Sequence, residues 1–382
     1  MGSEAPPGKF HAPGNPDVTP SGGNPNPPPP DPGGLLKFGT TLFGQSYSRY
    51  KEPTLAATGG TRYNAVENDT TSTIGGVTRK GSAVMRVYNN NGNGPGTWTD
   101  AHPAFFRADQ PVVYSWKWAT SVSQTTVKSD MRTFLDSKNA ATTPFVWLVA
   151  WHEPDNDWAA SEAVFTAWCN WQVWIREVLD EVAYASRTDF RFGFITTGGP
   201  WNKSQDPLGT TGVKGWQYIY NTVTTLRGGE DTWDFLGLDR YNPAWDGNGY
   251  MTYDKWAYRV KQAFAITGKP FVVGETGSPR AITSPGGFTT IADRDTERAS
   301  YIDTMYSSML TDGFYDAVCW WRVPALSGFS SGFSTIMITP TGYNGTPNSP
   351  TGGTDAPAVV DVHAQYCAQS MLAANPTISF QP

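Results

Sequence analysis

The sequence predicts an α/β fold, namely a (β/α)8 TIM barrel preceded by a disordered Pro/Gly-rich N-terminal tail. Short β-rich runs alternate with helix-like segments from residue 35 onward, which is typical of a parallel sheet. Residues 35–382 are long enough for eight such units, since this barrel takes from about 200 to over 400 residues. A doubly wound open sheet is the alternative, but neither a GxGxxG motif after the first run nor a P-loop is found.

Residues 1–34 contain eleven Pro and seven Gly, including the run Pro27–Pro30. Such a segment buries too little apolar surface to fold, so we interpret it as an extended linker or tail before a single domain at residues 35–382. A linker at the front suggests an upstream domain in the natural protein, although a plain disordered terminus fits equally well.

Eight β-rich runs and five helix-like segments follow in order. The predicted strands are Leu36–Leu42, Ala83–Tyr88, Val112–Trp116, Phe145–Trp151, Arg191–Thr196, Asp234–Tyr241, Pro270–Glu275 and Ala317–Arg322. The predicted helices are Val127–Lys138, Ser161–Tyr184, Tyr253–Ile266, Asp293–Leu310 and Ala356–Leu372. In the second of these helices, apolar residues recur at spacings of three and four, which places them on one face.

Composition narrows the class of partner. Asp plus Glu number 34 against 28 Lys plus Arg, and a net charge of −6 argues against nucleic acid. The longest apolar stretch is far shorter than the roughly 20 residues of a membrane span, so no membrane partner is expected. The chain also opens without a signal-peptide pattern.

Sixteen Trp are unusual and indicate flat faces for stacking on sugars. Cys169, Cys319 and Cys367 are expected to be buried free thiols.

The glutamates locate the expected chemistry. Of the ten, only Glu153 and Glu275 fall at the end of a predicted strand, where barrel enzymes carry their reacting groups. A carboxyl group there is costly unless it is paired or neutralised. One interpretation is a structural ion pair with Arg86 or Arg240. The other is a facing pair of carboxyls, one protonated acid and one nucleophile, as retaining glycoside hydrolysis requires.

These residues resemble glycoside hydrolase clan A, whose plan has an acid/base glutamate after strand four and a nucleophilic glutamate after strand seven. His152 before Glu153, in AWHEPDND, is similar to family 26, the β-mannanase-like branch. The resemblance implies Glu153 as acid/base and Glu275, in VVGETG, as nucleophile. It also implies that Tyr241 hydrogen-bonds the nucleophile and that Trp320 or Trp321 forms the floor of the −1 sugar site. The segment Pro154–Trp158 departs from the aromatic-rich continuation common in family 26.

Further candidates lie near the same strand ends. His152 is expected to orient Glu153 or to bind the sugar, with a packed core histidine as the alternative. Asp239 shares a strand face with Tyr241 and is interpreted as a positioning or sugar-hydroxyl contact, with nucleophile as a weaker alternative. The other candidates for sugar contact, each with core packing as its alternative, are Arg86, Trp116, Lys117, Trp118 and Trp201.

No metal or cofactor is expected. The four histidines are scattered, whereas a zinc site needs three or four convergent ligands. Asp155 and Asp157 are able to hold a structural calcium, but the dense ligand loop of such sites is missing.

The sequence therefore predicts a retaining endo-glycoside hydrolase acting on a polysaccharide or oligosaccharide, either β-mannan-like or a cell-wall glycan. The alternatives are a non-catalytic carbohydrate-binding or adhesion barrel and a furanosidase of the same clan. The linker composition fits a catalytic module of an extracellular or virion-associated protein.

Deleting residues 1–34 is expected to leave the melting temperature and activity essentially unchanged, because a Pro/Gly-rich segment contributes few buried contacts. Thermal denaturation of the full and shortened chains measures this. A fall of more than a few degrees would show that the segment packs on the domain.

Overall fold

The computed structural model describes residues 41–48, 71–74, 76–89, 92–158, 161–202, 208, 214–241, 251–277, 291–320 and 357–374. The chain divides into two units, and all of these residues belong to the second, residues 31–382. The predicted tail at residues 1–34 lies outside the described residues.

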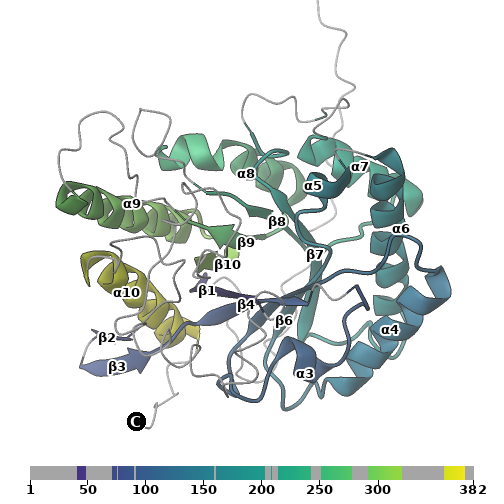
Figure 1. The fold of residues 1–382 in the computed structure, drawn as a ribbon, viewed down its shortest axis with the longest axis horizontal. Helices are drawn as coiled ribbons and strands as arrows, with labels where there is room; N and C mark the ends of the chain where they lie inside the picture. The colour runs from purple at the N-terminus through teal and green to yellow at the C-terminus, as the bar shows by residue number, and fades with distance from the viewer. Residues whose placement is uncertain are drawn as a thin grey trace, which may run out of the picture. The chain divides into compact units, whose positions relative to one another are not determined.

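Eight parallel strands close into a barrel, which confirms the predicted (β/α)8 fold (Figure 1). Each barrel strand pairs with the next barrel strand along the chain, and the last barrel strand pairs with the first to close the ring. The barrel strands are β1 (Leu42–Ser48), β4 (Val84–Asn89), β5 (Val112–Trp116), β6 (Val146–Ala150), β7 (Phe190–Thr197), β8 (Phe235–Asp239), β9 (Phe271–Thr276) and β10 (Tyr315–Trp320).

Helices follow the strands and cover the outside of the barrel. They are α3 (Trp98–Ala101), α4 (Gln124–Ser137), α5 (Pro154–Trp158), α6 (Glu162–Leu179), α7 (Trp216–Leu226), α8 (Tyr253–Thr267), α9 (Ile291–Asp312) and α10 (Pro357–Ala374). The last two lie side by side (Figure 1). Between β1 and β4, an antiparallel pair is formed by β2 (Thr71–Ile74) and β3 (Val77–Lys80). Within the described residues, no helix is both long and apolar enough to cross a membrane.

The core has two layers because each strand is buried on both faces. Side chains such as Val113, Val149 and Val272 fill the barrel interior. Large aromatic side chains fill the layer between the barrel and the helices, where Trp201 stacks on Trp216 with ring centroids 5.9 Å apart. Most of the unusual tryptophan content of the described residues therefore builds this outer layer.

Several elements differ from the sequence prediction, which did not include β2, β3, α3 or α5. The first strand is Leu42–Ser48 rather than Leu36–Leu42, and residues 36–40 lie outside the described residues. Its buried Gln45 gives no apolar signal, which explains the misplacement. Helix α7 was not predicted, because its β-branched and aromatic residues are typical of strands.

Candidate active site

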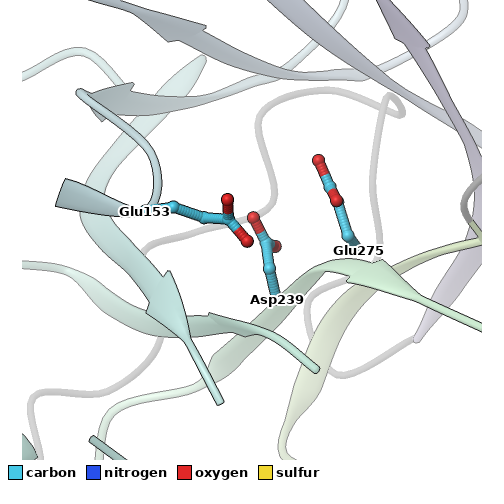
Figure 2. A group of neighbouring side chains, drawn as sticks. All are labelled: Glu153, Asp239 and Glu275. Atoms are coloured by element: carbon cyan, nitrogen blue, oxygen red, sulfur yellow. The ribbon is translucent and has the colours of Figure 1, made fainter. Parts of the chain in front are cut away.

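Three carboxyl groups meet at the C-terminal rim of the barrel. Glu153 follows β6, Asp239 ends β8 and Glu275 lies near the end of β9, and these are the fourth, sixth and seventh barrel strands. One carboxyl oxygen of each lies within 4.8 Å of those of the other two. Figure 2 shows the carboxyls of Glu153 and Asp239 next to each other, with the Glu275 side chain beside them. The structure thus brings together the two strand-end glutamates and the aspartate that the sequence singled out.

The turn after β6 places the Glu153 side chain at this rim. Trp151 has a φ of 62° and Glu153 a φ of 48°, a left-handed conformation that costs a non-glycine residue roughly 1–2 kcal/mol. The amide of Trp151 donates to the carbonyl of Trp116 at 2.6 Å, and the amide of Glu153 donates to the carbonyl of Ile195 at 2.9 Å. These two bonds fix the turn to the strands on either side of β6.

Glu275 accepts two tyrosine hydroxyls. Tyr88, in β4, donates to Oε1, and Tyr241, directly after β8, donates to Oε2. Burial and the nearby Glu275 raise the pKa of both tyrosines well above the ordinary value, so both remain protonated donors. The bond from Tyr241 is the one that the family resemblance implied. Tyr88 was missed, although its alternation with Arg86 along one strand was a usable signal.

Asp239 is the most deeply placed of the three carboxyls. Only 2% of it is exposed, and neither carboxyl oxygen has a hydrogen-bond partner among the described residues. Burial raises the pKa of Asp239 well above the ordinary carboxyl value; nearby Glu275 raises it further, while Arg86 opposes both. These surroundings therefore favour the neutral acid form of Asp239.

The structural ion pair considered from the sequence is not what holds the glutamates. Arg86 is fully buried, with its guanidinium carbon 4.8 Å from the ring centroid of Tyr88. Burial acts to lower the pKa of Arg86, but Tyr88, Asp239 and Glu275 outweigh it and the pKa is raised. Arg86 thus supplies a buried positive charge beside the carboxyls. Arg240 instead donates to the carbonyls of Trp201 and Trp256.

Glu153 has a different surrounding from Glu275. It is partly exposed, and the side-chain amide of Asn156 donates to its Oε2 at 3.1 Å. The ring of His152 packs edge-on against Tyr88, with centroids 4.7 Å apart. His152 therefore connects the ring that contacts Glu275 with the turn that carries Glu153. Asn156 was missed by the sequence analysis, since its role depends on the short helix α5.

Four predicted sugar-stacking tryptophans are packed in the core instead, which corrects the expectation that they line the site. Each is at most 2% exposed and packs against helices or other aromatic rings: Trp116, Trp118, Trp201 and Trp320. Trp320 packs against Tyr306 of α9. Trp321, the other candidate for the floor of the −1 sugar site, lies outside the described residues.

Lys117 follows β5 at the rim and contacts the turn after β6 and helix α5. Its Nζ is 4.0 Å from the ring centroid of Trp151 and 2.8 Å from Oδ2 of Asp157. Its contacts support the turn that carries Glu153.

The acidic residues of α5 do not converge on one point. Asp155 accepts from the amide and hydroxyl of Thr197, whereas Asp157 accepts from Lys117 and Trp151. These separate partners argue against the structural calcium site considered for the pair. In the described part of the chain, Glu153, Asp239 and Glu275 form the one group of three or more acidic, histidine or cysteine side chains close enough to share a metal ion. Because both oxygens of Glu275 already accept tyrosine hydroxyls, a hydrogen-bonded carboxyl cluster fits the site better.

The comparisons with known proteins support the fold. No family model matches the chain, and no curated protein matches it. Xylanase 10B from Thermotoga maritima is similar at 11% identity and a TM-score of 0.50, covering 88% of this chain and 98% of its own. An endo-β-1,3-glucanase of family GH128 from Amycolatopsis mediterranei matches at 14% identity and a TM-score of 0.44, covering 85% and 99%.

A fungal β-1,4-galactanase is similar at 12% identity and a TM-score of 0.46, covering 86% of this chain and 99% of its own. All three structural neighbours are glycoside hydrolases, but at these identities the likeness concerns the barrel fold. None is described as a family 26 enzyme, so that resemblance stays a prediction.

Asp239→Asn tests the protonation of the cluster. The amide mimics a neutral acid, so near pH 4 the variant and the native protein are expected to have similar melting temperatures. As pH rises from there toward the raised pKa, native Asp239 resists ionising while the unfolded chain releases its proton, and the native protein loses stability relative to the variant. Each unit by which the pKa is raised is worth about 1.4 kcal/mol.

Differential scanning fluorimetry of both proteins between pH 4 and 8 measures this difference. Groups far from the carboxyl cluster titrate alike in both proteins and cancel. A difference that stays constant with pH would contradict a neutral Asp239.

Proposed function

We propose that the chain is a retaining glycoside hydrolase that cleaves a β-linked polysaccharide, with Glu153 as general acid/base and Glu275 as nucleophile. The observation that carries the proposal is the proximity of these two carboxyls at the ends of the fourth and seventh strands, where one oxygen of each lies within 4.8 Å of the other. Retaining enzymes hold their two carboxyl groups about 5–5.5 Å apart, whereas inverting enzymes need about 6.5–9.5 Å to admit a water molecule.

The surroundings support this division of roles. Two hydroxyls donate to Glu275, which favours a carboxylate with a fixed orientation, as a nucleophile needs. Glu153 is partly exposed and accepts one side-chain amide, which suits a group that must give up a proton and take one back. Asp239 is buried and its raised pKa favours the neutral acid, which is a poor nucleophile.

The reaction then runs in two displacements. Glu275 attacks the anomeric carbon as Glu153 protonates the departing oxygen, and the electrons of the broken C–O bond remain on that oxygen. Glu153, now a carboxylate, takes a proton from water, which attacks the anomeric carbon and releases Glu275.

The substrate class is proposed as a β-mannan-like or other cell-wall glycan cut internally. An endo-acting enzyme is expected to release new reducing ends from at least one of mannan, xylan, laminarin and galactan. A native protein that binds one of these polymers but releases no reducing ends would identify a carbohydrate-binding barrel instead. The extracellular or virion-associated location is also a proposal, carried by the linker composition.

Azide rescue tests the roles of the two glutamates. Glu275→Ala is expected to abolish turnover, and azide should restore it as a glycosyl azide of inverted configuration, because it attacks from the emptied nucleophile side. Glu153→Ala is expected to lose about 10²- to 10⁴-fold on substrates with poor leaving groups, yet to react with activated aryl glycosides. Azide should then give the product of retained configuration.

NMR of each azide product measures the configuration. Glu230→Ala is the matched control, since it removes an exposed carboxylate and is expected to leave turnover unchanged. If Glu275→Ala gave the retained azide and Glu153→Ala the inverted one, Glu153 would be the nucleophile and Glu275 the acid/base. Normal hydrolysis by both variants would overturn the proposal.

A further inference from the structure

The helix α5 follows the strained turn at Trp151 and Glu153 and is tied to the barrel on two sides. Left-handed non-glycine residues persist only where their surroundings over-determine them. On one side, Oδ2 of Asp157 accepts from Nε1 of Trp151 at 2.7 Å and from Nζ of Lys117 at 2.8 Å. This group connects α5 to the residue after β5.

On the other side, Asp155 is tied to the end of β7. The amide of Thr197 donates to its Oδ1 at 2.9 Å, and the hydroxyl of Thr197 donates to its Oδ2. Asp155 is buried, whereas Asp157 is near the surface. The two aspartates thus hold the ends of a single helical turn between the strands that flank β6.

Asn156 lies between these two ties. Its side chain is exposed, its backbone amide donates to the carbonyl of Glu153 at 3.2 Å, and its side-chain Nδ2 donates to Oε2 of Glu153 at 3.1 Å. The side-chain N–H of Asn156 needs an acceptor oxygen. When Glu153 is protonated, this hydrogen bond therefore favours the form in which Oε2 carries no proton. The proton of Glu153 is then directed to Oε1.

We propose that Asn156 is a positioning residue, which α5 holds so that Glu153 presents the same oxygen as proton donor and then as proton acceptor. The proposal rests on the proposed function of Glu153. It assigns a purpose to Pro154–Trp158, the segment in which this chain departs from the family 26 pattern: the two aspartates fix the helix, and the asparagine between them fixes the carboxyl.

The test compares two leaving groups. Asn156→Ala and Asn156→Asp each remove the amide donor, and Asp keeps the shape. On 4-methylumbelliferyl β-mannobioside, β-xylobioside or β-laminaribioside, whichever the native enzyme cleaves, kcat/KM is expected to fall about 10- to 100-fold. On the 2,4-dinitrophenyl glycoside of the same sugar, the fall is expected to be under about threefold, because that leaving group needs no proton.

Two further variants sharpen the result. Asn139→Ala is the control. It removes an exposed asparagine after α4 whose side chain accepts from the nearby amide of Ala141, and kcat/KM on both substrates should equal that of the native enzyme. Asp157→Ala should show the same selectivity for leaving group as the Asn156 variants, together with a melting temperature lower by a few degrees.

The outcomes separate the two proposals. Suppose that Glu153→Ala discriminates between the two leaving groups. The positioning role would then be overturned if the Asn156 variants lost activity equally on both substrates or lost none on either. If Glu153→Ala itself showed no such discrimination, the acid/base role would fail and this inference with it. A shift in KM alone, with kcat unchanged on the methylumbelliferyl glycoside, would also overturn it and indicate sugar binding.

Discussion

The mutual repulsion of three buried or half-buried carboxyls is the constraint on which the site depends. One oxygen of each lies within 4.8 Å of those of the other two, and Arg86 brings a buried positive charge to them. Such a cluster is tolerable when one member stays protonated and another is held by hydrogen bonds. The deepest, Asp239, is the one whose pKa is raised by burial, and Glu275 is the one that two tyrosines hold. The environment thereby gives three similar acids three different sets of partners.

The barrel makes this arrangement possible because it brings strand ends that are distant in the chain to one rim. Tyr88 comes from the second barrel strand and reaches Glu275 on the seventh, 187 residues later. The aromatic layer fills the space between the strands and the helices. The local strain that aims Glu153 is maintained by contacts to the neighbouring strands, so the acid/base depends on packing that lies outside the carboxyl cluster.

The fold and the two glutamates were predictable because parallel strands read as continuous apolar runs, and a charged residue at the end of such a run stands out. The same continuity explains why buried tryptophans were wrongly expected to line the site. Both faces of these strands are buried, so the sequence does not reveal that Trp116 faces the helices while Val113 faces the barrel interior. Tyr88 and Asn156 were missed because the partner of Tyr88 is set by barrel closure and that of Asn156 by a five-residue helix.

Trapping the glycosyl-enzyme intermediate tests the central claim most directly. A 2-deoxy-2-fluoro glycosyl fluoride of the sugar that the enzyme cleaves should inactivate it with time, and peptide mass spectrometry should find one added fluoro-sugar on Glu275. Dilution should slowly restore activity as water releases the sugar. A label on Asp239 or Glu153 would contradict the assignment of the nucleophile. Continued hydrolysis of substrate with inversion of configuration and no label would contradict the retaining mechanism itself.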